Sequence, residues 1–263
     1  MSQETNWADR ALREKSCAVS SIIPYDSYSG MAYGSLQISE ASLNAPEKIE
    51  WYDSIRHSKT EYAVLRLNGD TLSVSENEYF LLDHENRIIE FNTLEDTSDP
   101  NSEPYRFTYL YDEKGQLSKK KWFLSARNQD LPFFVYNYTW LEGNLARSEV
   151  REGWGDKRKV MSSELLYDQG LVARDFLYFF PDAHELTPYI FSINAGKKSK
   201  NLPQRILVKM YDGEGNEQET YQTDFKGYQF SDDNRVTEFF VSGDVMDGLP
   251  MMNGRIRFEY QCK

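Results

Sequence analysis

The chain has 263 residues, and its 30 Lys and Arg against 42 Asp and Glu give a net charge of −12 at pH 7. A chain of this length can bury one large core, and all-β barrels and sandwiches reach it as a single domain. A protein that binds phosphates carries a basic face, so the acidic balance argues against nucleic acid as a partner. No apolar run reaches the ~20 residues of a membrane-spanning helix, and we therefore expect no transmembrane segment.

Residues 1–20 come first and predict an N-terminal helical segment. The stretch NWADRALREK at 6–15 predicts one short helix, with Asn6 as its N-cap. The segment is polar and contains no secretory signal. We expect an extracytoplasmic protein, in the periplasm or at the cell surface, if a signal was removed, and a cytoplasmic one otherwise.

Residues 21–263 change to strands and turns, which predicts a single β-hairpin-repeat domain. Asn68-Gly69 lies between two alternating runs and predicts a hairpin with a type I′ turn. In YRFTYLY (105–111) the aromatic residues occupy alternate positions and so share one face of a strand. The following Asp112 to Gly115 has the chemistry of a turn, because Asp favours its start and Gly supplies a left-handed residue.

The same hairpin unit recurs along the chain. Further turns are expected at Asn86, Gly115, Gly143, Gly170, Gly215 and Asn234. The first three intervals between these residues are 29, 28 and 27 positions, which is typical of a repeat, and the later irregularity indicates an insertion near 181–203. The pattern predicts an all-β fold: a large antiparallel meander of at least ten strands, forming a curled sheet or an open barrel-like structure, after the short N-terminal helix.

The hairpins carry a family resemblance. YDEKGQL (111–117), YDQGLV (167–172) and YDGEGN (211–216) resemble the hairpins of tyrosine/aspartate-repeat shell proteins. Over roughly residues 50–262, the hairpin spacing is similar to that of bacterial envelope lipoproteins of unknown function built from β-hairpin repeats. The resemblance implies an exported, non-catalytic bacterial protein. The chain departs from that group because no lipid-attachment cysteine follows an apolar segment and the period breaks after Gly170.

The sequence contains no recognisable catalytic or metal-binding motif. His57, His84 and His184 form no H-E-x-x-H or other close pair, and no nucleophile elbow or glycine-rich phosphate loop occurs. Asp212-x-Glu214-x-Asn216 imitates the start of a calcium loop, but Glu217 replaces the required glycine, so an ordinary turn is expected. We predict no catalytic residue, no metal and no cofactor.

Two basic runs have an ordinary structural interpretation. Lys119-Lys120-Lys121 predicts a solvated strand edge, and Lys197-Lys198-Ser199-Lys200 predicts a solvated loop. Neither is expected to bind an anionic partner.

The candidate binding residues are Trp154 and three methionines. Trp154 lies between two glycines at the expected tip of a hairpin, where an exposed indole can contact a sugar face, a peptide or a protein. The structural alternative is that Trp154 folds back onto its own hairpin or a neighbouring strand. Met246, Met251 and Met252 lie in the loop 243–254, as an adaptable binding surface or as a plug over the open end of the sheet.

Cys17 and Cys262 are the two cysteines and lie near opposite ends of the sequence. In a closed or strongly curled sheet the first and last elements can be neighbours, so a disulfide could join them in an oxidising compartment. The alternative is that both are buried as small apolar residues.

Two hypotheses of function remain open. The first is a non-catalytic binding or scaffolding protein of the bacterial cell envelope, which contacts glycan or protein through exposed aromatic residues. The alternative is a glycan-acting hydrolase that uses paired Asp and Glu on a concave β surface. Two inward carboxylates about 5–10 Å apart in a cleft would favour hydrolysis, and a flat or convex aromatic face would favour binding.

Overall fold

The described part of the chain consists of strands, turns and one long insertion. In the computed structural model it comprises residues 17–26, 31, 32, 34–39, 47–54, 56–94, 103–124, 131–155, 157–172, 176, 178–182, 185, 186, 193–244 and 253–262. The helix expected at 6–15 lies outside these residues. Among the described residues, no helix is long and apolar enough to cross a membrane.

Sixteen strands follow one another in the described part. They are β1 (Cys17–Asp26), β2 (Gly34–Ser39), β3 (Glu47–Asp53), β4 (Ser58–Asn68), β5 (Thr71–Ser73), β6 (Glu78–Leu82), β7 (Ile88–Thr93), β8 (Tyr105–Tyr111), β9 (Leu117–Leu124), β10 (Phe134–Leu141), β11 (Asn144–Glu152), β12 (Lys159–Val172), β13 (Asn201–Tyr211), β14 (Glu217–Phe230), β15 (Val236–Gly243) and β16 (Gly254–Cys262). The strand β1 begins at Cys17, inside the range 1–20 that we assigned to the N-terminal segment.

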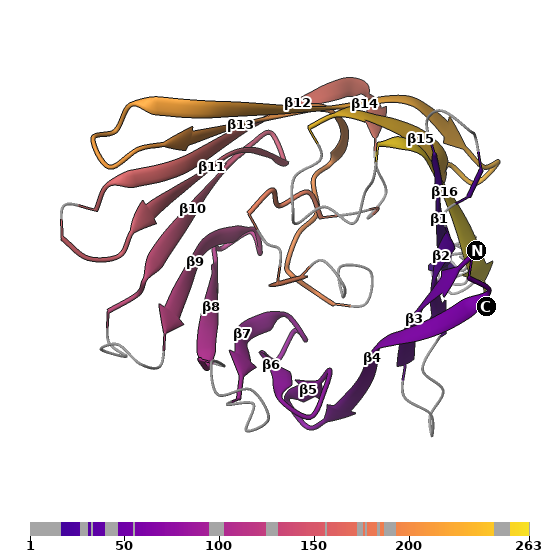
Figure 1. The fold of residues 1–263 in the computed structure, drawn as a ribbon, viewed down its shortest axis with the longest axis horizontal. Coiled ribbons are helices and arrows are strands. Elements are labelled where there is room, and N and C mark those ends of the chain that lie inside the picture. Colours follow the sequence, from indigo (N-terminus) through magenta and orange to yellow (C-terminus); the bar gives the residue numbers. More distant parts are fainter. Residues whose placement is uncertain are drawn as a thin grey trace, which may run out of the picture.

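Each strand pairs antiparallel with the next, and β16 pairs with β1 to close a barrel (Figure 1). The predicted all-β meander of at least ten strands is therefore confirmed, whereas the barrel is closed rather than open. Nine residue pairs between β1 and β16 make the closure. A closed sheet has no unpaired edge strand, and this removes the exposed backbone groups that an open sheet would leave.

The stretch 105–111 forms β8 and directs its aromatic residues toward the interior, as predicted. Phe107 and Tyr109 are fully buried, and Tyr105 and Tyr111 pack against the same core. Arg106, between them, has a side chain that is 40% exposed on the outer face. Strand alternation thus directs the aromatic side chains of β8 to the inner face and leaves a mixed outer face, on which Leu110 is 48% exposed.

A register shift in β9 overturns one expectation. Tyr109 pairs with Lys120 and Tyr111 pairs with Leu117, so β9 holds one extra residue between these two pairs. The extra residue is a β-bulge, and it changes which face the following side chains occupy. Lys120 consequently lies on the inner face and is 0% exposed. The prediction that Lys119-Lys120-Lys121 is a solvated strand edge is wrong for Lys120.

The expected turns share one local mechanism. In the turns that begin at Asp83, Asp112 and Asp212, the Oδ1 atom accepts backbone N–H groups two and four residues later, at 2.8–2.9 Å. The residue three positions after each Asp has positive φ. These residues are Asn86 (58°), Gly115 (76°) and Gly215 (88°), and the predicted turn residues Gly143 (85°) and Asn234 (61°) also have positive φ. The Asp212 turn uses its carboxylate on its own backbone, as expected of an ordinary turn.

The hairpin predicted at Asn68-Gly69 is present, with a different turn. Asn68 pairs with Thr71, so the two loop residues are Gly69 and Asp70. Only Gly69 of this pair has positive φ, at 64°, which excludes a type I′ turn. Two successive positive φ values, which define type I′, instead occur in the loop Glu142-Gly143, at 52° and 85°.

The turn predicted at Gly170 is wrong. The strand β12 continues through Gly170 to Val172, and its partner in the sheet is β13 rather than a strand of its own hairpin. Asp168 pairs with Leu202 and Val172 pairs with Asn201, so residues 169–171 bulge out of the ladder. The chain does not form a hairpin here, because β12 stays paired with β13 up to Val172.

The insertion expected near 181–203 lies between β12 and β13 and occupies the interior of the barrel. Figure 1 shows this connection inside the ring of strands. Its buried apolar side chains belong to the same core as the inner faces of the strands: Phe176, Tyr178, Phe179, Phe180, Leu186, Ile193 and Ala195. The wall and the insertion therefore form one hydrophobic core.

Candidate functional site

The buried polar residues in the interior form a luminal cluster of Lys120, Glu185, Asp182, Tyr109 and Tyr138. The Lys120 Nζ atom donates to Glu185 Oε1 at 2.9 Å and to the Asp182 backbone oxygen at 2.7 Å. The Tyr109 hydroxyl donates to Glu185 at 3.0 Å, and the Tyr138 hydroxyl donates to Asp182 Oδ1 at 3.0 Å. Strands β8, β9 and β10 supply the lysine and the tyrosines, whereas the insertion supplies both carboxylates. The cluster therefore fastens the insertion to the wall.

The electrostatics of the luminal cluster are those of a closed site. Burial raises the pKa of Tyr109 and of Tyr138 well above the ordinary range, so both remain hydrogen-bond donors. Burial also raises the pKa of Asp182, against the opposing charge of Lys120. The Lys120 Nζ atom lies 4.0 Å from the ring centroid of Tyr136, which adds a cation–π contact. Because the side chains of Lys120 and Glu185 are both 0% exposed, the cluster offers no surface to a substrate.

The end of the insertion, residues 194–201, forms a rim segment that runs across successive hairpin turns. The Ile88 N–H donates to the backbone oxygen of Asn194 at 2.9 Å, directly after the turn that begins at Asp83. The Lys197 N–H donates to Gly115 O at 2.9 Å, and the Lys200 N–H donates to Gly143 O at 3.0 Å.

The spacing of these rim contacts has a simple geometric cause. Neighbouring hairpins lie two strand spacings apart, or about 9.5 Å. Three residues of extended chain span about 10 Å, so every third residue of the rim segment meets the next turn. The Lys197–Lys200 run thus holds the rim segment to the turns. Lys197 and Lys200 are exposed, as expected of a solvated loop. Lys198 is half-buried, with its Nζ atom 5.0 Å from the ring centroid of Tyr178.

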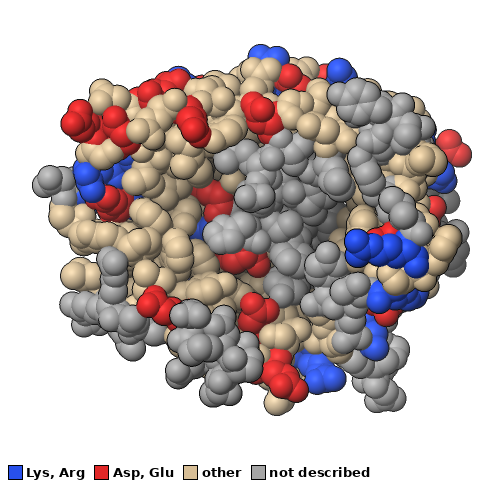
Figure 2. Space-filling view, viewed as in Figure 1, with Lys and Arg blue, Asp and Glu red and all other residues tan. Residues whose placement is uncertain are grey.

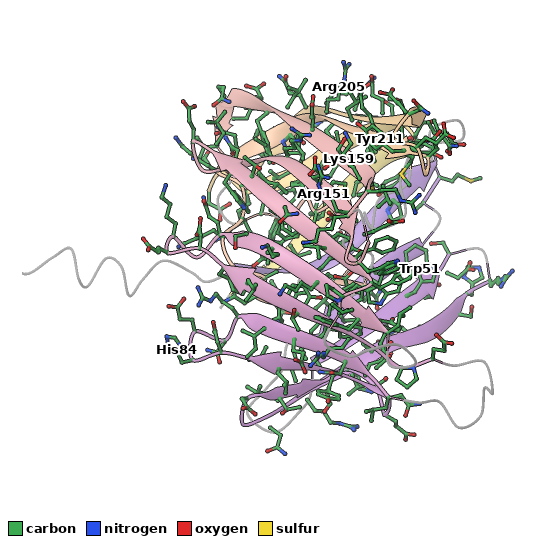
Figure 3. The ribbon with its side chains drawn as sticks, turned by 90° about the vertical axis from the view of Figure 1, so that its left-hand side faces the viewer. Trp51, His84, Arg151, Lys159, Arg205 and Tyr211 are labelled. Atoms are coloured by element: carbon green, nitrogen blue, oxygen red, sulfur yellow. The ribbon has the colours of Figure 1, made fainter. Side chains whose placement is uncertain are left out.

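The outer face of the wall carries charged side chains in pairs. Arg151 Nε lies 2.6 Å from Glu149 Oε1, and Arg205 Nε lies 2.6 Å from Asp224 Oδ1. Figure 3 shows Arg151, Arg205 and Lys159 on the face formed by β11 to β13, and Figure 2 shows charged residues around the periphery in the view along the barrel. The described outer face therefore carries ion pairs beside exposed apolar side chains such as Leu110, Leu166 and Phe240.

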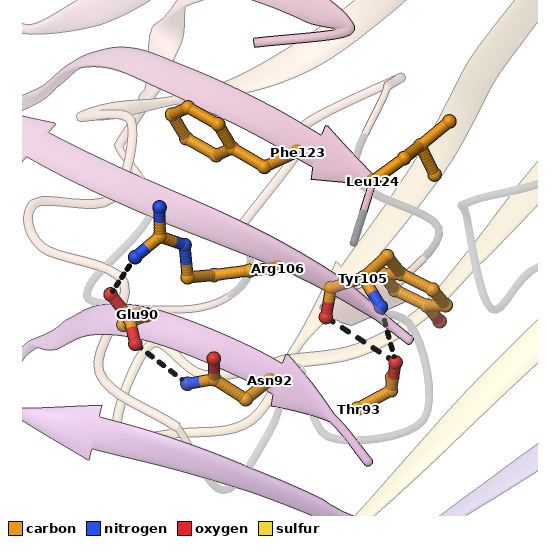
Figure 4. Close-up of a pocket in the computed structure, with 7 residues that line it drawn as sticks. All are labelled: Glu90, Asn92, Thr93, Tyr105, Arg106, Phe123 and Leu124. Carbon is orange, nitrogen blue, oxygen red and sulfur yellow. Dashed lines mark hydrogen bonds and ion pairs between the residues drawn. The ribbon is translucent and has the colours of Figure 1, made fainter. Parts of the chain in front are cut away.

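One cavity of about 220 Å³ opens across β7, β8 and β9, where Thr93 and Leu124 end two of these strands and Tyr105 begins the third (Figure 4). Arg106 and its partners Asn92 and Phe123 lie on the outer face, whereas Tyr105 packs on the core. We call this cavity the outer groove. Its lining residues are Glu90, Asn92, Thr93, Tyr105, Arg106, Phe123 and Leu124. They come from three strands that are consecutive in the barrel, so the groove depends on strand register.

The polar side chains of the outer groove form an ion pair and a hydrogen bond with one another. Arg106 Nη1 lies 3.6 Å from Glu90 Oε2, and the Asn92 side-chain amide donates to Glu90 Oε1 at 2.8 Å. The Arg106 guanidinium lies 4.6 Å from the ring centroid of Phe123. The paired charges of Glu90 and Arg106 neutralise each other, while donors, acceptors and an aromatic ring remain side by side. This arrangement suits a neutral ligand with many hydroxyl groups.

Trp154 lies at the tip between β11 and β12, as the sequence indicated, and its ring packs on a neighbour. The ring centroids of Trp154 and Phe133 are 4.7 Å apart, and the Gly153 N–H donates to Phe133 O at 2.9 Å. The side chain is half-buried. The packing agrees with the structural alternative, and a binding role for Trp154 stays a prediction.

The remaining candidate residues are scattered. Met246, Met251, Met252 and His184 lie outside the described residues. His84 is exposed in a turn, and His57 Nδ1 lies 3.1 Å from the hydroxyl of Tyr52. Within the described ranges, no group of three or more His, Cys, Asp and Glu is arranged to hold a metal ion.

The sequence did not indicate the outer groove, because none of its residues belongs to a motif or has an unusual neighbour in the sequence. The alternation in β7 and β8 did signal which side chains face outward. It did not say that Glu90, Arg106 and Phe123 would lie next to one another, because this requires the pairing of three strands.

The observed fold is that of a closed antiparallel β-barrel, and two solved structures are similar to it. One is a porin-like protein from Bacteroides uniformis ATCC 8492, with a TM-score of 0.56 and 12% sequence identity over 93% of this chain and 96% of that chain. The other is a porin-like protein from Bacteroides vulgatus ATCC 8482, with a TM-score of 0.56 and 12% identity over 94% of this chain and 99% of that chain. No protein-family model and no curated protein matches this chain. At this level of identity the similarity concerns the fold alone.

Proposed function

We propose that this protein is a non-catalytic binding protein of the bacterial cell envelope, and that the outer groove takes a glycan. The observation that carries the proposal is the groove itself, in which Glu90, Asn92, Arg106 and Phe123 combine neutralised polar groups with an aromatic ring. Sugars present hydroxyl groups at their edges and C–H groups on their faces, and such a lining matches both.

The envelope location is supported by two further observations. The two similar barrels are described as porin-like proteins of Bacteroides, and the hairpin pattern resembles that of exported bacterial lipoproteins. A role as a solute channel is less well supported, because buried side chains such as Phe180, Leu186 and Lys120 occupy the lumen of the described part. The outer face also carries ion pairs such as Arg151–Glu149 and Arg205–Asp224 among its exposed apolar residues, whereas a lipid-embedded barrel has a continuous apolar band.

The alternative hypothesis, a glycan-acting hydrolase, requires two inward carboxylates that a substrate can reach, and the described residues meet only the first of these conditions. Asp182 and Glu185 are inward carboxylates, as that hypothesis requires. They are buried, however, and hydrogen-bonded to Tyr138, Tyr109 and Lys120. A substrate would have to displace the insertion to reach them.

The experiment is a titration of the full chain with cello-, malto- and chito-hexaose by isothermal calorimetry. We expect one of these neutral oligosaccharides to bind, and Arg106→Ala to weaken that binding by about tenfold, because it removes hydrogen-bond donors from the groove and leaves the charge of Glu90 without its partner.

Arg255→Ala is the matched control. Arg255 also lies on the outer face, 3.8 Å from Glu238 and 4.1 Å from the ring centroid of Tyr25, and its side chain is 39% exposed. The variant Arg255→Ala should leave the affinity for the oligosaccharide unchanged. Failure of all three sugars to bind at millimolar concentration, or equal effects of the two arginine variants, would overturn the proposal.

A further inference from the structure

The closing pair of strands brings the two cysteines opposite each other. In the ladder between β1 and β16, Cys17 is the direct partner of Cys262, two rungs beyond the pair Val19 and Tyr260. All other neighbouring strands in the barrel are consecutive in the sequence, so this seam alone joins the beginning of the described chain to its end.

The register brings the backbones of the two cysteines within reach of a disulfide. Directly opposed residues of an antiparallel pair have Cα atoms about 4.5–5.5 Å apart. Disulfides bridge Cα separations of about 4.4–6.8 Å. The ladder is continuous from this pair through Ala18–Gln261 to Val19–Tyr260, so the backbone register at the two cysteines is that of a regular antiparallel pair.

We infer that Cys17 and Cys262 form a disulfide that closes the barrel covalently. The two thiols lose two protons and two electrons as the S–S bond forms, and a protein disulfide of the oxidising compartment accepts both electrons and is reduced to a dithiol. The bond forms by thiolate attack through a mixed disulfide. It keeps the seam from opening and exposing two edge strands, each with a row of unpaired backbone groups.

This inference does not rest on the glycan proposal. The seam consists of β1 and β16, whereas the outer groove consists of β7, β8 and β9. The two can fail separately, because one concerns a covalent bond and the other concerns affinity for a sugar.

The first test is the alkylation state of the full chain recovered from its native compartment. The protein is unfolded in guanidinium with iodoacetamide, with and without prior reductant, and its intact mass is measured. We expect no alkylated cysteine without reductant and two with it. Alkylation of both cysteines without reductant would show that the bond is absent and overturn the inference.

The second test separates a bond in the seam from a bond between two chains. The wild type and the variant Cys17→Ser/Cys262→Ser are melted with and without reductant. We expect reductant to lower the melting temperature of the wild type to that of the variant and to leave the variant unchanged. A disulfide-linked dimer on a non-reducing gel, or a wild type insensitive to reductant, would contradict the intramolecular bond.

Discussion

Replacement of Lys120 by Met should destabilise the barrel strongly. Lys120 is fully buried and donates hydrogen bonds to Glu185 and to the backbone oxygen of Asp182. Met keeps an unbranched chain of similar length but carries no charge. Loss of the cation leaves the Glu185 carboxylate without its opposite charge in a site closed to water. Removal of one partner of a buried ion pair costs about 3–5 kcal/mol.

This loss is large compared with the whole free energy of unfolding of a typical protein. Free energies of unfolding are typically about 5–15 kcal/mol, so a loss of about 4 kcal/mol in Lys120→Met removes a major share. The double variant Lys120→Met/Glu185→Leu should recover most of the loss, because replacement of a whole buried pair by apolar groups is often neutral or better.

The assay is equilibrium unfolding in guanidinium, followed by tryptophan fluorescence at pH 7. A lower midpoint with an unchanged slope reports a change in stability alone. Lys119→Met and Lys121→Met are the matched controls, since both lysines flank Lys120 and are only half-buried. They should change the free energy of unfolding by less than about 0.5 kcal/mol. If Lys120→Met stays within about 1 kcal/mol of the wild type, the luminal cluster does not fasten the insertion as we argue.

Two further predictions concern single positions. Gly196→Ala should destabilise the protein by roughly 2–4 kcal/mol in the same assay, because Gly196 has φ 85° and an added Cβ would lie 2.6 Å from Gly115 O. Gly69→Ala, at φ 64° with no atom within 4 Å of the added Cβ, should cost only about 1 kcal/mol, and equal costs would show that the rim contact is unimportant. Trp154→Ala should lower stability by about 1–2 kcal/mol through loss of its contact with Phe133. An unchanged melting temperature together with weaker ligand binding would instead assign the indole to a binding surface.

The sequence by itself determined the strands and most of the turns, because both follow from local chemistry. Alternation with a period of two is a property of each strand alone. A turn such as Asp112–Gly115 needs only a carboxylate that accepts nearby backbone N–H groups and a glycine with positive φ. The five turns at Asn86, Gly115, Gly143, Gly215 and Asn234 could therefore be predicted from short stretches.

The tertiary structure decided the features that depend on strand register and on the insertion inside the barrel. YDQG at 167–170 has the same local pattern as a hairpin turn, yet β12 continues through it to pair with β13, because Asn201 rather than a nearby residue completes the ladder. One extra residue in β9 carries Lys120 from the outer face to the inner face, where Glu185 of the insertion meets it. Closure of the barrel and the outer groove likewise arise from pairings between residues distant in sequence. Local propensities set the backbone of each hairpin, but only the assembled sheet determines which side chains become neighbours.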